Sequence, residues 1–191
     1  MQYKNIFKLI FSLISSPAKA WEDICVNQDS QKVILDYVYP MIGFCGIAWL
    51  IGSIYRRGWN TPLSFQLSMV DCCGIAIALF GGFFLAAYII NKYLLRWFRI
   101  ERSPQQVLVF IGYSMTMVFI ADMITGIFPS MQPIGIMIQL YTLYIVYVGS
   151  TPMMKVDNSF KMPFTIAFSI TIIGCPMLIE FIYQNLVTIF N

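Results

Sequence analysis

Three carboxylates lie inside or at the edges of long apolar stretches, and they are the residues best placed to do chemistry. They are Asp71, Asp122 and Glu180. A charged side chain at the centre of a membrane-spanning helix costs about 2.5–3.5 kcal/mol, and less near the interface. Each carboxylate therefore needs compensation, which an arginine, a proton or a bound cation can supply.

Two arrangements of these carboxylates are open from the sequence. In the first, Arg56 and Arg57 pair with them in a network that closes one end of a helix bundle. In the second, the carboxylates and Gln139 line an intramembrane site for a cation or for protons. Both arrangements require the three carboxylates to lie at a similar depth.

The sequence favours neither an enzyme nor a bound cofactor. Histidine is absent, which removes the usual general base and the commonest metal ligand. Asp71 and Asp122 suit a paired-aspartate protease, but no Gly-x-Gly-Asp element is present. A metal site that combines carboxylates with cysteines fits less well, since adjacent cysteines on a helix point about 100° apart; those cysteines are Cys72, Cys73 and Cys175.

Composition predicts an all-α membrane protein whose surroundings are a lipid bilayer. Of the 191 residues, 59% are hydrophobic and 11% are charged, whereas a soluble domain carries about 25% charged residues. The apolar residues form blocks near the ~20 residues that cross a hydrocarbon layer of ~30 Å. The formal charge is +3, without the clustered basic residues typical of nucleic-acid binding.

Five membrane-spanning helices are predicted, and together they form a transmembrane bundle over residues 37–191. The predicted spans are residues 38–55, 70–90, 107–128, 133–150 and 164–183, with the last able to continue to residue 190. The third and fourth spans form a tight hairpin around Pro129 and Pro133. Small residues recur every four positions in the second span and permit close helix packing; they are Gly74, Ala78, Gly82 and Ala86.

Residues 1–36 are predicted to form short amphipathic helices at the membrane interface. Residues 3–14 place apolar side chains on one face of a helix that is too short to cross a bilayer. Pro17 is a favourable first residue for a second helix, in which Trp21 is expected at headgroup depth. The first apolar run is too short for a signal peptide, so cleavage is not expected.

Lysine and arginine are divided unevenly between the two sides of the predicted bundle. Ten of the twelve lie on the side of the N-terminus, and only Arg56 and Arg57 lie on the other. The positive-inside rule then predicts a cytoplasmic N-terminus and an external C-terminus. In this orientation Asp71, Asp122 and Glu180 share a depth in the outer part of the membrane, near the two arginines.

Short motifs in three spans resemble the Yip family (Ypt-interacting proteins) of multi-spanning membrane proteins. Asp36, Tyr37 and Pro40 enter the first span where the family typically shows an Asp-Leu-x-x-Pro element. The third span contains Gly112-Tyr113-Ser114, which is similar to the family's Gly-Tyr element, and a tyrosine-rich stretch follows at residues 140–149. The resemblance runs in order from about Pro17 to the end of the chain.

The resemblance implies a non-enzymatic protein that binds membrane proteins or lipids in membrane organisation or trafficking. Eukaryotic members carry a longer cytosolic N-terminal region and are associated with Rab-type GTPases. Here the predicted N-terminal segment before the bundle has 36 residues, which argues against GTPase binding and resembles the compact bacterial branch in an inner membrane. The alternative is a small cation or proton transporter or channel that uses the intramembrane carboxylates. A transport path needs polar groups that reach both sides of the membrane. Because the predicted charges gather at one end of the bundle, a binding function is favoured over transport.

Overall fold

The computed structural model describes residues 3–26, 30–58 and 61–190, and within these ranges every regular element is helical. The helices are α1 (Tyr3–Ser15), α2 (Pro17–Val26), α3 (Ser30–Val33), α4 (Tyr39–Arg57), α5 (Pro62–Ile89), α6 (Leu95–Trp97), α7 (Pro104–Ser114), α8 (Thr116–Ile127), α9 (Gln132–Met154) and α10 (Lys161–Phe190). Short helical turns connect some of them: η1 (Ile34–Val38), η2 (Ile90–Leu94) and η3 (Pro129–Met131). The all-α prediction is confirmed.

Five continuous helical segments of the described chain are long and apolar enough to cross a membrane, as predicted. They are Gln31–Arg57, Pro62–Trp97, Pro104–Ile127, Pro129–Met154 and Lys161–Ile189. Most extend several residues beyond the predicted spans, because backbone hydrogen bonding continues where hydropathy falls. Residues 31–36, which the sequence places in the N-terminal segment, are continuous with the first spanning helix.

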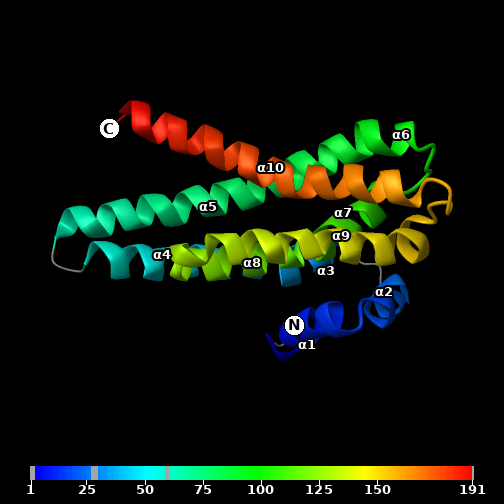
Figure 1. Ribbon diagram of the computed structural model, residues 1–191, viewed down its shortest axis with the longest axis horizontal. Helices are drawn as coiled ribbons and strands as arrows, with labels where there is room; N and C mark the ends of the chain where they lie inside the picture. Colours follow the sequence, from blue (N-terminus) through cyan, green and yellow to red (C-terminus); the bar gives the residue numbers. More distant parts are fainter. Residues whose placement is uncertain (1–2, 27–29, 59–60, 191) are drawn as a thin grey trace.

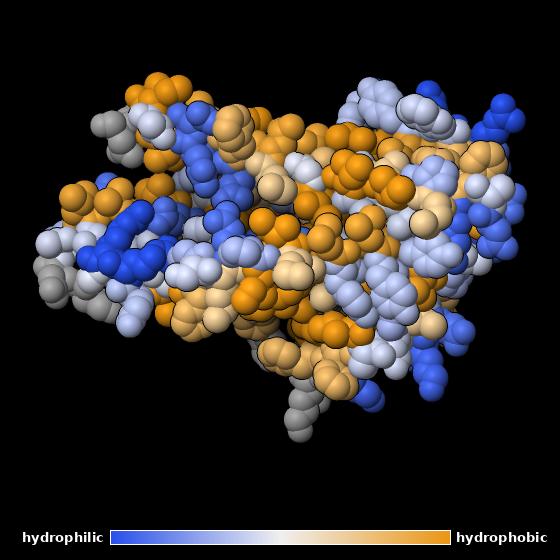
Figure 2. All heavy atoms as spheres, in the orientation of Figure 1, coloured by the Kyte–Doolittle hydropathy of each residue, from blue (hydrophilic) through white to orange (hydrophobic). Residues whose placement is uncertain are grey.

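The spanning helices form two groups with the N-terminal helices beside them (Figure 1). Helices α5 and α10 pack together, α4, α8 and α9 lie on the other side, and α2 packs on α9. The α4–α5 connector is at one end of the long axis, and the α6–α7 and α9–α10 connectors are at the other. Hydrophilic residues gather at both ends, with broad hydrophobic areas between them (Figure 2). A bilayer requires this distribution.

Glycines allow the closest helix contacts in the bundle. A Cβ atom added to Gly82 of α5 would lie 2.6 Å from the Cα atom of Pro176 in α10, and one added to Gly74 would meet a tyrosine ring of α10. Helices α4 and α8 are equally close, since a Cβ atom on Gly52 would overlap the carbonyl of Gly126. The predicted stripe of small residues in the second span therefore packs against the fifth.

The third span lies at the centre of the bundle and is divided at Met115 into α7 and α8. Aromatic side chains fill the interior around it. Phe110 of α7 packs on Phe168 of α10, with ring centroids 4.8 Å apart. The fully buried phenylalanines are Phe83, Phe110, Phe119, Phe164 and Phe168.

Trp21 anchors the N-terminal helices to the bundle. Its ring is completely buried, and its Nε1 atom donates a hydrogen bond of 3.1 Å to the carbonyl of Ile145 in α9. Gly149 leaves the space that the indole occupies, because a Cβ atom there would overlap it. Trp21 is thus a core residue, and the prediction that it lies among lipid headgroups is wrong. The α1 helix is amphipathic as expected, with Leu13 buried and Phe11 72% exposed.

Gly82→Ala tests whether close packing of α5 on α10 stabilises the bundle. The added methyl group must displace the backbone at Pro176, so we expect a loss of about 1–3 kcal/mol in unfolding free energy. Thermal and denaturant unfolding in detergent micelles measure this loss. Gly174→Ala is the control, because no atom lies within 4 Å of its added Cβ. Equal stability of the two variants would contradict the packing role of Gly82.

Candidate functional site

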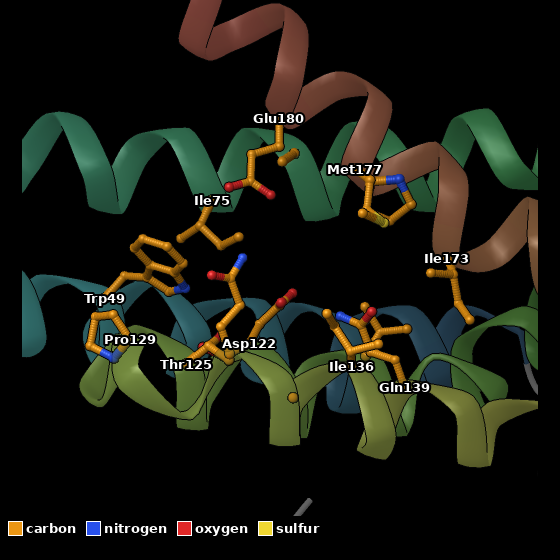
Figure 3. A pocket seen from close by; sticks show the side chains of 15 residues that line it. Trp49, Ile75, Asp122, Thr125, Pro129, Ile136, Gln139, Ile173, Met177 and Glu180 are labelled. Atoms are coloured by element: carbon orange, nitrogen blue, oxygen red, sulfur yellow. The ribbon is translucent and has the colours of Figure 1, made fainter.

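A pocket of about 240 Å³ lies between α10 and α5 on one side and α4, α8 and α9 on the other. Asp122 of α8 and Glu180 of α10 point into it from opposite walls (Figure 3). The polar lining residues are Trp49, Asp122, Thr125, Gln132, Gln139 and Glu180. Two of the three predicted carboxylates and the predicted amide therefore face one space.

A proline in α10 positions Glu180 over this pocket. Pro176 lies inside the helix, where it removes one backbone hydrogen bond and favours a bend. The C-terminal half of α10 leans away from α9 (Figure 1), and Glu180 follows the proline by one turn. The Nε2 atom of Gln184 donates a hydrogen bond of 3.0 Å to Oε1 of Glu180, which helps to hold the carboxylate.

The opposite wall of the pocket comes from α8 and α9. Asp122 and Thr125 share a face of α8, since they are three residues apart. The Thr125 hydroxyl donates a hydrogen bond of 2.9 Å to the carbonyl of Ala121 in the same helix. Its proton is therefore not available to a ligand in the pocket. Helix α9 approaches closely at Gly135, where a Cβ atom would lie 2.5 Å from Cγ2 of Thr125. Gln139 is one turn further along α9 and faces the same space (Figure 3).

The electrostatics of the pocket suit a positively charged group. Among the described residues that line it, none is a lysine or an arginine. In their ionised forms, Asp122 and Glu180 would together attract a cation that enters the pocket, because charges are weakly screened there. Carboxylates and amides are ligands for an ammonium group.

Asp71, the third predicted carboxylate, belongs to a different cluster. Its Oδ2 atom lies 2.9 Å from Nη1 of Arg57 and accepts a 2.6 Å hydrogen bond from the hydroxyl of Ser53. Arg56 instead donates from Nη1 to the carbonyl of Gly126 at 3.2 Å. The predicted set is therefore divided into an ion pair between α4 and α5 and an acidic pocket beside α10.

Several residues of these two clusters were missed by the sequence analysis. Ser53 precedes Arg57 by four positions, so helical spacing could have indicated that they share a face. No pattern in the sequence indicates that Gln132 and Trp49 line the pocket. Their positions there depend on the α8–α9 hairpin and on the contact between α4 and α8. Within the described ranges, no group of three or more His, Cys, Asp or Glu side chains could hold a metal ion; the considered site with Cys72, Cys73 and Cys175 is not assembled.

The motif residues of the first and third spans meet where α7 ends and α8 begins. Tyr37 of η1 and Thr116 of α8 are joined by a 2.6 Å hydrogen bond between their hydroxyl oxygens. The Tyr37 and Tyr113 rings are 4.9 Å apart at their centroids. A Cβ atom on Gly112 would lie 3.0 Å from Cγ1 of Val33, so glycine permits this contact. The other motif residues flank the junction: Asp36 and Pro40 are half-buried, and Ser114 is buried.

A family model described as the Yip1 domain matches residues 11–179 of the chain. The matched range runs from α1 into α10 and includes both motifs that meet at Tyr37 and Tyr113. It confirms the resemblance predicted from those motifs. No curated protein and no solved structure matches the chain.

The ion pair of Arg57 and Asp71 predicts a coupling that Arg56 does not share. We expect a double-mutant cycle of Arg57→Gln and Asp71→Asn to give a coupling energy of about 1 kcal/mol. The value is modest because both side chains are partly exposed (37% and 28%). Unfolding in detergent measures it. A cycle of Arg56→Gln with Asp71→Asn should be additive, since Arg56 contacts a backbone carbonyl. Equal coupling of both arginines would contradict a specific pair.

Proposed function

The chain belongs to the Yip1 domain family, and from that premise we propose that it is a non-enzymatic binding protein of the membrane. It is an integral membrane protein with five helices suited to crossing a bilayer. In this proposal the pocket beside α10 receives a cationic group of a lipid or of a membrane partner. The observation that carries it is the convergence of Asp122 and Glu180 on one pocket that has no basic lining residue in the described chain.

The dimensions of the pocket favour a small charged group over a whole molecule. Its volume of about 240 Å³ is below the ~300–1,000 Å³ typical of pockets that enclose drug-sized ligands. An ammonium group carries several N–H donors, which suit a pocket lined by Asp122, Glu180 and Gln139. Hydrogen bonds between charged partners are the stronger kind. A lipid with an amine headgroup therefore fits the proposal well.

The packed interior supports binding in preference to passage through the membrane. A transport path needs polar groups that reach both sides of the bilayer. Beyond the pocket, towards α7, the bundle is filled by fully buried aromatic side chains that include Phe83, Phe110 and Phe119. This packing separates the acidic pocket from the end of the bundle that carries the α6–α7 and α9–α10 connectors.

We propose an inner-membrane location with a cytoplasmic N-terminus. Two of the basic connectors, α6–α7 and α9–α10, lie at the same end of the bundle, opposite the α4–α5 connector (Figure 1). Arg57 is the last residue of α4, next to that opposite connector. The positive-inside rule favours the cytoplasm for the more basic end. The acidic pocket would then open within the outer half of the membrane.

Neutralising both carboxylates tests the proposed binding site. We expect Asp122→Asn with Glu180→Gln to lower retention of phosphatidylethanolamine at least tenfold, since two charged acceptors are lost and a tenfold change corresponds to ~1.4 kcal/mol. Native mass spectrometry of protein from nanodiscs of equal phosphatidylethanolamine and phosphatidylcholine content measures this retention. Asp23→Asn, which changes an exposed carboxylate of α2 outside the pocket, is the control. Unchanged retention in the double variant would refute a lipid-amine site.

Cation or proton transport is the second candidate, because Asp122 and Glu180 share a pocket. Liposomes with an entrapped pH dye, and with a potassium or sodium gradient, separate the two functions. A binding protein should give flux no higher than empty liposomes. Flux that is present in the natural chain and lost in Asp122→Asn would instead establish transport.

A further inference from the structure

Basic side chains from α6 and from two connectors line adjoining hollows at the end of the bundle opposite the α4–α5 connector. We propose that these residues, Arg96, Arg99, Arg102 and Lys155, form an arginine groove that binds a phosphate group. An anionic lipid headgroup and a free phosphate ion share this chemistry. The site is separate from the acidic pocket and independent of the function proposed for it.

The arginine groove consists of two hollows with a common wall. The larger has a volume of about 780 Å³ and is lined by Arg96, Arg99 and Arg102. The smaller, of about 340 Å³, is lined by Arg99 and Arg102 together with Lys155. A group held between the hollows can therefore be reached from the α6–α7 and α9–α10 connectors at once.

The charges that face the groove are predominantly positive. Glu101 lines both hollows, and Asp157 lines the smaller one. In the described part of the chain, the ion pair found joins Arg57 to Asp71, and none joins these two carboxylates to the groove. Four basic side chains line the two hollows, against two acidic ones, so hydrogen-bond donors remain available to a bound anion. Arginine presents several donors in a plane and binds phosphate through paired hydrogen bonds.

Two groove residues adopt a backbone conformation that favours glycine. Among the described residues, Arg99 and Lys155 are the non-glycine residues with positive φ, at 54° and 50°. Each residue ends a helix in the left-handed conformation that helix C-termini commonly adopt: the amide of Ile100 donates to the carbonyl of Leu95, and the amide of Val156 donates to the carbonyl of Ser150. Both Arg99 and Lys155 are basic and both line the smaller hollow, so these two helix ends bring two positive charges to the same hollow.

Contacts between the connectors hold the groove in shape. The Nε atom of Arg102 donates a hydrogen bond of 3.3 Å to the carbonyl of Met154, the last residue of α9. The rings of Phe98 and Phe164 pack edge to face with centroids 5.5 Å apart. The α6–α7 connector is thereby fixed against α9 and α10, which lowers the ordering cost of binding.

The position of the groove favours a lipid as the source of the phosphate. Trp97, next to Arg96, is 83% exposed, and exposed tryptophans at helix ends typically lie at headgroup level. Basic pockets between spanning helices on the cytoplasmic side bind anionic headgroups. A headgroup can enter the groove from the bilayer while its acyl chains stay in the membrane.

The affinity of the full-length protein in detergent for dioctanoyl phosphatidylglycerol and, separately, for inorganic phosphate tests this proposal. We expect Arg96→Gln with Arg99→Gln to raise the dissociation constant for the lipid about tenfold, since two charged donors are lost. Lys8→Gln with Lys19→Gln is the matched control: it removes the same charge from exposed residues of α1 and α2 outside the groove. The control should bind as tightly as the natural chain.

The two probes distinguish the sources of the phosphate. Binding of the lipid without competition from inorganic phosphate supports a headgroup site, and mutual competition supports a site for free phosphate. Equal weakening by the arginine and lysine pairs would overturn the proposal, because it indicates general surface charge. Failure of both probes to bind the natural chain would overturn it as well.

Arg99→Gly provides a test that does not depend on the stability of the glutamine variants. Glycine relieves the positive φ, so the melting temperature should rise or stay unchanged, while the dissociation constant for the lipid should increase severalfold. A rise in melting temperature with unchanged affinity would show that Arg99 has no binding role and would refute the groove.

Discussion

The close contact between α5 and α10 at Gly82 and Pro176 is the constraint on which the acidic pocket depends. The glycine lets the proline backbone approach, and the proline interrupts the hydrogen bonding of α10 at that level. The two helices are thus fixed together where α10 bends. Glu180, one turn beyond, is carried over Asp122 (Figure 3). Without this contact nothing would hold Glu180 and Asp122 on the same pocket.

The remaining polar groups are divided between the ends of the bundle according to the cost of placing charge in hydrocarbon. At one end the charge of Asp71 is neutralised by Arg57, and Ser53 donates a hydrogen bond to the same carboxylate. At the other end, arginines of α6 and of the α6–α7 connector lie near Lys155 of the α9–α10 connector, and these basic residues have no such partner in the described chain. A protein that pairs charge at one end and leaves it open at the other has distinct surfaces for the two leaflets.

The sequence predicted the number of spans, the α8–α9 hairpin and the family, because hydropathy, proline positions and short motifs are local properties. It also selected Asp122, Glu180 and Gln139, since polar residues inside apolar helices stand out. It placed Asp71 in the same set, and it expected Trp21 at headgroup depth. The contacts of Asp71 and Trp21 depend on how each helix is rotated about its axis and on the angles at which the helices cross. The order of residues along the chain shows neither the rotation nor the crossing angle.

Length, hydropathy and charge asymmetry by themselves determined that this chain is a helical membrane protein with five spans. The tertiary structure alone decided which carboxylate pairs with arginine, where the acidic pocket forms and which connectors build the arginine groove. The physical reason is that lipid tails are as apolar as the helix surfaces, so hydrophobicity does not choose helix partners. Close contacts at residues such as Gly52 and Gly82 make that choice, and they are specific to the folded chain.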